Sequence, residues 1–175
     1  FKGGSLVKFL AGGLVDVKTD WDKWLFFLCD ERVVPSDSED SNFGAYKKHL
    51  IGKIPVKEEQ FVIIDDTLSG EDAAVDYSEK LERHFGSGGL PKFDLLLLGM
   101  GEDGHTCSLF PGHRLLDEST LWVAHISDSP KPPPTRITLT LPVINNAANC
   151  VFALTGAGKA DVVKVILSLS SVRRA

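Results

Sequence analysis

The sequence predicts an α/β protein with a doubly wound, mostly parallel sheet and helices on both faces, in a Rossmann-like arrangement. Two observations predict this class. Strand-like runs alternate with helix-like runs along the chain, and several strand-like runs are continuously apolar, which is typical of strands buried on both faces. The 175 residues, 43% of them hydrophobic and 25% charged, suit one globular domain. Because no internal repeat or linker divides the chain, we expect a single domain over residues 1–175.

Apolar runs bounded by turn residues predict the strands. These runs cover residues 24–30, 61–65, 93–99, 121–126, 136–141 and 149–156. Short apolar runs of this kind are typical of buried strands in a parallel sheet. Residues 129–134 read SPKPPP, which predicts a stiff, extended loop between two strands.

Capping residues predict helices at residues 41–50 and 69–86, and the spacing of apolar residues predicts a third at residues 158–170. In the second of these, Ser69 stands three residues before Asp72, which is an N-cap signature. The same segment ends in Arg83 and His84 followed by Gly86, which is a helix C-terminal signal. The third segment repeats apolar residues at helical spacing.

The net charge of −5 and the lack of a long basic run argue against a nucleic-acid partner. A small anionic substrate stays open, because local lysines and arginines decide that affinity. No apolar stretch approaches the roughly 18–20 residues of a membrane span, and no signal peptide is visible. We therefore expect a cytoplasmic protein without a membrane partner, and a monomer.

The cysteines Cys29, Cys107 and Cys150 lie far apart and form no C-x-x-C pair. This pattern predicts reduced thiols in a reducing compartment. We expect Cys29 and Cys150 in the core, because both lie in apolar strand-like runs. The chain starts at Phe1 and stops shortly after an apolar helix pattern, so we expect a chain truncated at both ends.

Polar residues follow the predicted strands, and ligands in an open α/β sheet bind beyond the carboxyl ends of the strands. Such residues lie at or after the ends of the runs at 24–30, 93–99 and 121–126. The candidate site residues are Asp30, Arg32, Asp103, His105, Lys131 and Arg136. A structural role is the alternative for each, because charges at strand ends also cap helices, pair at the surface or remain solvated.

The stretch from Gly99 to Gly104 has the spacing G-x-G-x-x-G and follows a predicted strand. One interpretation is a dinucleotide-binding turn, with Asp128 as the ribose-binding acid. Against it, Pro111 interrupts the helix that the third glycine should open. The other interpretation is that the glycines let the backbone turn sharply and project His105, with Asp103 orienting it as a general base.

Two further features could take part in chemistry. Cys107 lies two residues after His105 and is an alternative nucleophile, although residues so close on a turn rarely aim both side chains at one point. Gly3, Gly4 and Ser5 precede a helix-like segment. Glycines and an N-cap serine at a helix start can bind an anion through backbone N–H groups.

These motifs resemble the 6-phosphogluconolactonase branch of the family that also contains glucosamine-6-phosphate deaminase. The resemblance runs over nearly the whole chain, and it is most specific over residues 93–113 and 127–145. Shorter matching segments cover residues 3–5, 29–44 and 155–163. The resemblance implies a doubly wound α/β fold, hydrolysis of 6-phosphogluconolactone to 6-phosphogluconate in the oxidative pentose phosphate pathway, and no metal or organic cofactor.

The resemblance also implies roles for single residues. His105 would be the general base that activates water, Asp103 would orient or tune it, and Asp30 would place a carboxylate at the sugar. The residues implied to hold the phosphate or the developing oxyanion are Gly3, Gly4, Ser5, Arg32, Gly104, Lys131 and Arg136. The substrate implied is a small phosphorylated sugar lactone.

The deaminase activity is the close alternative. Its pattern places a Glu before the proline that follows the histidine, where this chain has Phe110 before Pro111. Its strand end reads Asp-Glu-Tyr, where this chain has Arg32 in place of the tyrosine. Both departures favour the lactonase, because opening an amino sugar needs the extra carboxylate. An inactive remnant that binds sugar phosphates or self-associates is a third reading, because family members extend beyond both ends of this chain.

Overall fold

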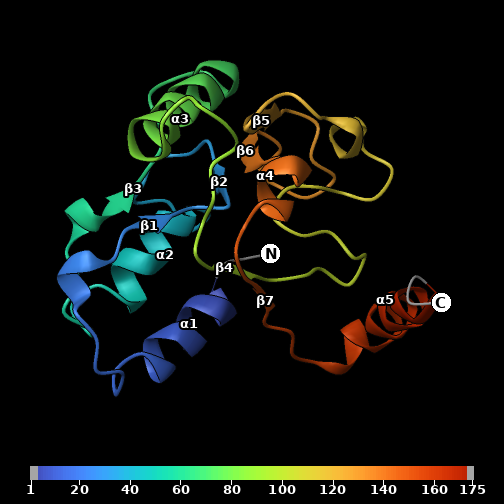
Figure 1. Ribbon diagram of the computed structural model, residues 1–175, viewed down its shortest axis with the longest axis horizontal. Helices are drawn as coiled ribbons and strands as arrows, with labels where there is room; N and C mark the ends of the chain where they lie inside the picture. Colours follow the sequence, from blue (N-terminus) through green and yellow to red (C-terminus); the bar gives the residue numbers. More distant parts are fainter. Residues whose placement is uncertain (1–3, 173–175) are drawn as a thin grey trace.

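Strands and helices alternate in the computed structural model, which describes residues 4–172 (Figure 1). The strands are β1 (Phe26–Phe27), β2 (Asp30–Arg32), β3 (Phe61–Val62), β4 (Leu96–Leu98), β5 (Val123–Ile126), β6 (Arg136–Leu139) and β7 (Cys150–Phe152). The helices are α1 (Gly4–Gly13), α2 (Asn42–His49), α3 (Gly70–Phe85), α4 (Leu141–Asn145) and α5 (Ala160–Val172). Short 3-10 turns lie at Trp21–Lys23, Glu58–Gln60, Arg114–Asp117 and Ala157–Lys159.

The described strands form three small sheets. Strands β1 and β3 pair in parallel, and so do β4 and β7. The third sheet has the order β2-β6-β5, and both of its pairings are antiparallel. The predicted α/β class is therefore confirmed together with its parallel pairs, whereas the strands at the SPKPPP loop pair antiparallel because a short connection joins β5 and β6.

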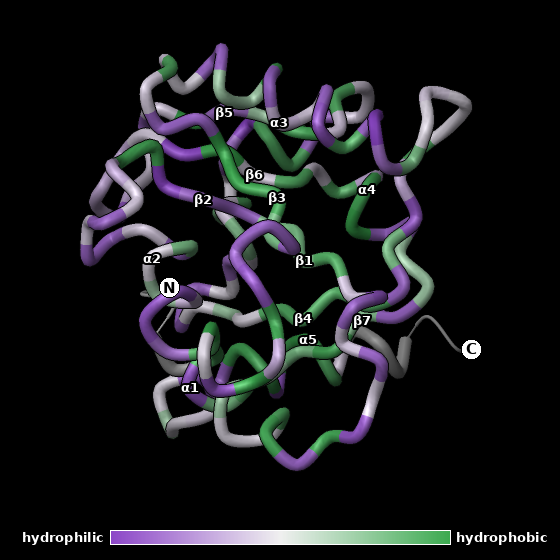
Figure 2. The backbone as a smooth tube through the Cα atoms, turned by 90° about the vertical axis from the view of Figure 1, so that its left-hand side faces the viewer, coloured by the Kyte–Doolittle hydropathy of each residue, from purple (hydrophilic) through white to green (hydrophobic). Residues whose placement is uncertain are grey.

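The prediction of one strand over residues 24–30 is wrong, because this segment contains parts of two strands. The chain leaves β1 after Phe27, and Asp30 begins a second strand that pairs with β6. The Asp-Glu-Arg sequence that was expected to follow a strand thus forms one itself. Figure 2 shows β2 as a hydrophilic segment, although Glu31 and Arg32 are buried.

Helices α2 and α3 start and end where their capping residues predict. The Ser41 hydroxyl accepts a hydrogen bond from the Gly44 N–H at 3.0 Å, and the Ser69 hydroxyl accepts one from the Asp72 N–H at 3.2 Å. Helix α3 ends at Gly86, whose φ of +78° lies in the left-handed region that glycine adopts without strain.

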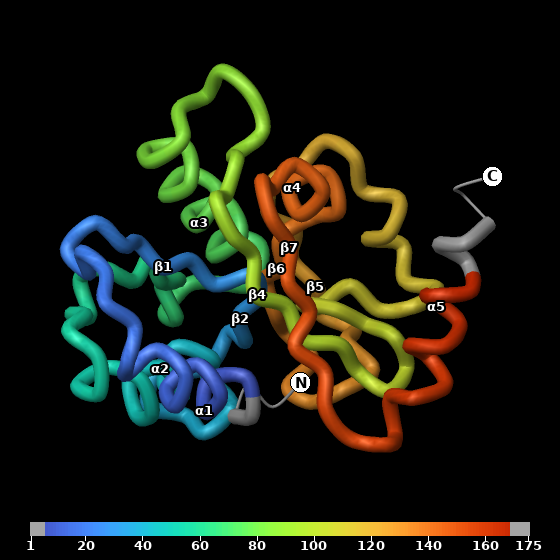
Figure 3. The backbone as a smooth tube through the Cα atoms, turned by 60° about the horizontal axis from the view of Figure 1, so that its bottom comes forward, coloured from blue at the N-terminus to red at the C-terminus, as the bar shows by residue number. Residues whose placement is uncertain are grey.

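Two hydrophobic clusters hold the elements together. The larger one packs α3 against β5 and β6 and continues to β4 and α4. The smaller one joins α1, α2, β1 and β3. Figure 3 shows α1 and α2 side by side on the opposite side of the molecule from α5. The expectation that Cys150 lies in the core is wrong, because all three residues of β7 are exposed.

A cavity of about 720 Å³ is lined by consecutive residues of β1 and of β4. These two strands are not hydrogen-bonded to each other in the described residues. Most of its wall is apolar. Its polar lining includes Asp30, Asn42 and His105.

We expect Tyr77→Phe to lower the free energy of unfolding by about 1–3 kcal/mol. Tyr77 is fully buried in α3, and its hydroxyl accepts a hydrogen bond from the Leu28 N–H at 2.8 Å. The hydroxyl also lies 3.1 Å from the Leu28 carbonyl, so phenylalanine removes the polar link between α3 and the end of β1. Urea denaturation measures the change. Val75→Ala, at an exposed position of the same helix, is the control and should change stability by less than about 0.5 kcal/mol. If Tyr77→Phe were as stable as Val75→Ala, the hydrogen bond of the Tyr77 hydroxyl would not stabilise the fold.

Candidate functional site

The glycine turn after β4 brings Asp103 and His105 together. The Gly101 N–H donates to the His105 carbonyl at 2.8 Å, and the Gly104 N–H donates to the Gly101 carbonyl at 3.1 Å. A Cβ atom at Gly101 would collide with the His105 ring and the Asp103 carboxylate. Gly104 has a φ of +88°, which an L side chain adopts only under strain.

No helix follows this turn before the 3-10 segment at Arg114–Asp117. A dinucleotide-binding turn places its third glycine at the start of a helix, whose N-terminus holds the pyrophosphate. Here the glycines instead clear room for two side chains. The geometry therefore favours the interpretation in which the turn carries His105.

His105, Asp103 and Lys131 form one polar group. The His105 Nδ1 atom lies 2.5 Å from the Asp103 Oδ1 atom. The Lys131 Nζ atom lies 3.1 Å from the Asp103 Oδ2 atom and 3.4 Å from the His105 Nδ1 atom. A carboxylate bonded to Nδ1 holds the proton on that nitrogen and makes Nε2 the basic one.

Burial and hydrogen bonding shift the pKa values of His105 and Asp103. The His105 side chain is 2% exposed, and its ring packs against Phe110 with centroids 4.6 Å apart. Burial lowers the pKa of His105 below its ordinary value, although the hydrogen bond to Asp103 partly offsets this. Burial also disfavours the Asp103 carboxylate, but hydrogen bonds from His105 and Lys131 outweigh it and hold the pKa of Asp103 well below its usual range. At neutral pH the pair is a neutral imidazole beside a carboxylate.

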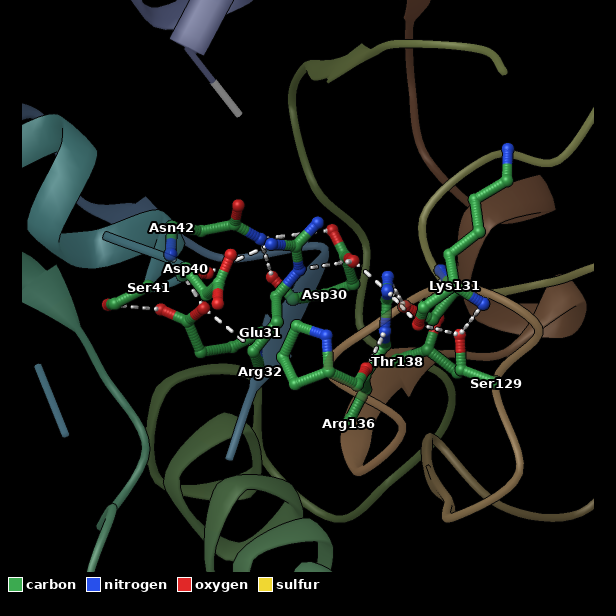
Figure 4. Close-up of polar contacts among 12 residues, drawn as sticks. Asp30, Glu31, Arg32, Asp40, Ser41, Asn42, Ser129, Lys131, Arg136 and Thr138 are labelled. Carbon is green, nitrogen blue, oxygen red and sulfur yellow. Dashed lines mark hydrogen bonds and ion pairs between the residues drawn. The ribbon is translucent and has the colours of Figure 1, made fainter. Parts of the chain in front are cut away.

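A second polar group surrounds Asp30. Its Oδ2 atom accepts a hydrogen bond from the Ser108 hydroxyl at 2.9 Å. The Arg136 Nη1 atom lies 3.4 Å from the same hydroxyl, and the Arg32 Nε atom lies 4.0 Å from the Asp30 Oδ2 atom. Figure 4 shows Asp30 between the two guanidinium groups. Asn42 completes the group through its side-chain amide, which donates to the Asp30 carbonyl at 2.8 Å.

The two arginines are buried and held mainly by backbone carbonyls. Arg136 is 1% exposed and donates from Nε to the Pro133 carbonyl at 2.9 Å and from Nη2 to the Lys131 carbonyl at 2.7 Å. Burial, followed by the nearby charge of Arg32, lowers the pKa of Arg136. Arg32 donates from Nη1 to the Asp40 carbonyl at 2.8 Å. The Lys131 side chain, by contrast, is 41% exposed and extends away from Arg136 (Figure 4).

Glu31, next to Asp30, has a structural role. Its buried carboxylate accepts hydrogen bonds from the N–H groups of Asn42 and Phe43 at 2.7 and 2.8 Å, at the start of α2. Burial raises the pKa of Glu31 to about 7, against the effect of these hydrogen bonds. The helix-capping alternative weighed for the strand-end charges therefore applies to Glu31.

The cavity joins one residue of each polar group. Asp30 and His105 both line it, and so do Leu6 and Val7 near the start of α1. Gly4 and Ser5 open α1, although the Ser5 side chain and all of Gly3 lie outside what the structure describes. The structure thus brings Asp30, Arg32 and Arg136 into one group and Asp103, His105 and Lys131 into another.

Sequence reasoning missed Ser108 and Asn42. Ser108 is fully buried and contacts both Asp30 and Arg136. Its position three residues after His105, inside the longest matching segment, was the available signal. Among residues 4–172, no three His, Cys, Asp or Glu side chains come close enough together to hold a metal ion. Within the same range, no helix is both long and apolar enough to cross a membrane.

Fold and site together define an α/β protein in which a buried histidine bonded to an aspartate shares a cavity with a carboxylate flanked by cations. Comparison with known proteins identifies its family. The family model described as glucosamine-6-phosphate isomerases/6-phosphogluconolactonase matches residues 1–175. The chain belongs to this family.

Individual relatives agree with this assignment. The chain is 51% identical over 170 residues to 6-phosphogluconolactonase of Rattus norvegicus and 50% identical to that of Homo sapiens, covering 94% of this chain in each case. It spans 66% of the length of each of these relatives, just under two thirds. The crystal structure of 6-phosphogluconolactonase from Thermotoga maritima superposes with a TM-score of 0.80 at 29% identity, covering 93% of this chain and 71% of that one.

We expect Asp103→Asn to lower the pKa of His105 further. The Asp103 carboxylate favours the protonated imidazole, so its neutralisation removes that support and leaves burial and the nearby Lys131 ammonium to disfavour the charge. NMR titration of the His105 ring protons measures the change. Asp128→Asn is the matched control, because Asp128 contacts His113 at 3.1 Å and should leave the His105 titration unaltered. A His105 pKa that rises in Asp103→Asn would refute the arrangement.

Proposed function

We propose that this chain contains the catalytic core of a 6-phosphogluconolactonase, which hydrolyses 6-phosphogluconolactone to 6-phosphogluconate in the oxidative pentose phosphate pathway. One observation carries the proposal: a histidine that burial keeps neutral and that Asp103 orients lines the same cavity as Asp30. The names of the relatives at about 50% identity support the substrate.

In this proposal His105 is the general base. The hydrogen bond from Nδ1 to Asp103 orients the ring, and Nε2 takes a proton from the water that attacks the lactone carbonyl carbon. The resulting tetrahedral intermediate breaks the bond between that carbon and the ring oxygen. His105 then returns its proton to the departing ring oxygen, so one water is consumed and one carboxylic acid is formed. Asp103 stabilises the imidazolium between these steps, as a buried carboxylate does for a catalytic histidine.

Cationic groups complete the proposed mechanism. Pre-placed positive charge near a developing oxyanion is often the larger catalytic contribution. Lys131, whose ammonium is partly exposed beside Asp103, is in this proposal a cation that meets the substrate. Arg32 and Arg136 are buried around Asp30, so in this proposal they position that carboxylate and supply a positive field. Gly3, Gly4, Ser5 and Gly104 remain the proposed backbone contacts to phosphate or oxyanion.

The deaminase alternative is less well supported. The residue before Pro111 is Phe110, which is 2% exposed and packs on the His105 ring. An apolar ring there supplies no third carboxylate and strengthens the burial that keeps His105 neutral.

We further propose that the reaction needs no metal or organic cofactor, that the protein acts as a cytoplasmic monomer, and that nucleic acid is not a partner. Some relatives are named chloroplastic, so fractionation of the source cells tests the location.

We expect His105→Ala to lower the rate of 6-phosphogluconolactone hydrolysis by about 10²–10⁴-fold, the usual contribution of a positioned acid–base group. The measurement is acid release by this chain, corrected for spontaneous hydrolysis. His49→Ala, at the last residue of α2, is the matched control and should keep full activity.

Three measurements distinguish the lactonase, the deaminase and the inactive remnant. Hydrolysis that survives in His105→Ala would remove His105 as the base. A folded chain that releases ammonia from glucosamine 6-phosphate would instead assign the deaminase activity. A folded chain that binds 6-phosphogluconate but turns over neither substrate would favour the inactive remnant.

A further inference from the structure

Cys29 and Cys107 come from distant parts of the sequence and meet beside the proposed site. Cys29 directly precedes Asp30, and Cys107 directly precedes Ser108. The Asp30–Ser108 hydrogen bond of 2.9 Å holds the two segments side by side. The Cys29 side chain is the largest influence that raises the pKa of the neighbouring Cys107 thiol.

Both segments are also tied to β6. The Leu139 N–H donates to the Cys29 carbonyl at 2.9 Å, and the Ser108 N–H donates to the Thr138 hydroxyl at 3.2 Å. Both cysteines pack on the larger hydrophobic cluster and line the cavity of about 720 Å³. The thiols are therefore preorganised as a pair and reachable by a small molecule that enters the cavity.

We propose that Cys29 and Cys107 are a redox modification site, which a peroxide converts to an intramolecular disulfide. The proposed mechanism of hydrolysis uses neither thiol. The disulfide would join the segments that present Asp30 and Ser108, and Cys107 already has a left-handed φ of +52°. Forming a sulfur–sulfur bond of about 2.05 Å between two free thiols shifts these segments, so oxidation should slow hydrolysis.

The chemistry balances with hydrogen peroxide as the oxidant. The Cys29 thiolate attacks one peroxide oxygen, the O–O bond breaks, and hydroxide leaves and becomes water, which gives a sulfenic acid. The Cys107 sulfur then attacks the Cys29 sulfur and expels the second oxygen as water. Contact with Cys29 and burial raise the pKa of the Cys107 thiol, so this second step is faster in alkaline buffer. The two sulfurs are oxidised and the two peroxide oxygens are reduced.

Mass spectrometry tests the disulfide directly. The chain is treated with hydrogen peroxide in mildly alkaline buffer, alkylated and digested with trypsin. Cleavage places Cys29 in residues 24–32, Cys107 in residues 93–114 and the exposed Cys150 in residues 137–159. The expected product is a reductant-sensitive cross-link between the first two peptides. Cross-links that involve only Cys150, or sulfinic acid on Cys29 or Cys107 without a cross-link, would overturn the proposal.

Three variants and a second readout complete the test. Cys150→Ser should still form the cross-link, whereas Cys29→Ser and Cys107→Ser should each abolish it. The effect on rate rests on the proposed function. Oxidised Cys150→Ser should hydrolyse the lactone several-fold more slowly and recover with dithiothreitol, and an unchanged rate would overturn the regulatory effect. If the reduced chain does not hydrolyse the lactone, the proposed function fails while the cross-link still decides the modification site.

Discussion

The proposed site depends on the contact of two side chains with the bare backbone of Gly101. His105 and Asp103 occupy the space that a Cβ atom at Gly101 would need. This close approach lets the imidazole bury itself against Phe110 while its Nδ1 atom bonds to a carboxylate. Burial alone would leave a weak base, and a carboxylate alone would favour the imidazolium. The two together give a histidine that is neutral at physiological pH and fixed in one tautomer.

A second constraint brings remote parts of the chain to this turn. Asp30 and Ser108 lie in different segments and meet through a 2.9 Å hydrogen bond, and Arg136 of β6 lies 3.4 Å from the same serine hydroxyl. Buried charges are tolerated only when they are paired and hydrogen-bonded. The arginines and Asp30 satisfy this requirement collectively, which makes the position of each depend on the others. The same alignment brings Cys29 and Cys107, which directly precede Asp30 and Ser108, to neighbouring positions beside β6.

Local signals predicted much of the fold. The serines and glycine that bound α2 and α3 act over a few residues, so sequence alone locates them. Pairing is non-local, and neither the end of β1 at Phe27 nor the antiparallel pairing of β2 with β6 could be derived from apolar runs. Cys150 was misplaced for a related reason, since an apolar run does not show whether another element covers it. Within the site, spacing alone suggested Asp103 and His105, whereas Ser108 gains its importance only when β2 and the glycine turn meet.

The pH dependence of kcat/KM for 6-phosphogluconolactone hydrolysis reports the protonation state of His105 in the free enzyme, and so tests whether His105 is a neutral base. We expect a constant value of kcat/KM at neutral pH and a decline in acid with a single inflection below 6.5, the ordinary pKa of histidine, since burial lowers that of His105. An inflection above 6.5, or a value that does not decline in acid, would contradict the neutral, buried base.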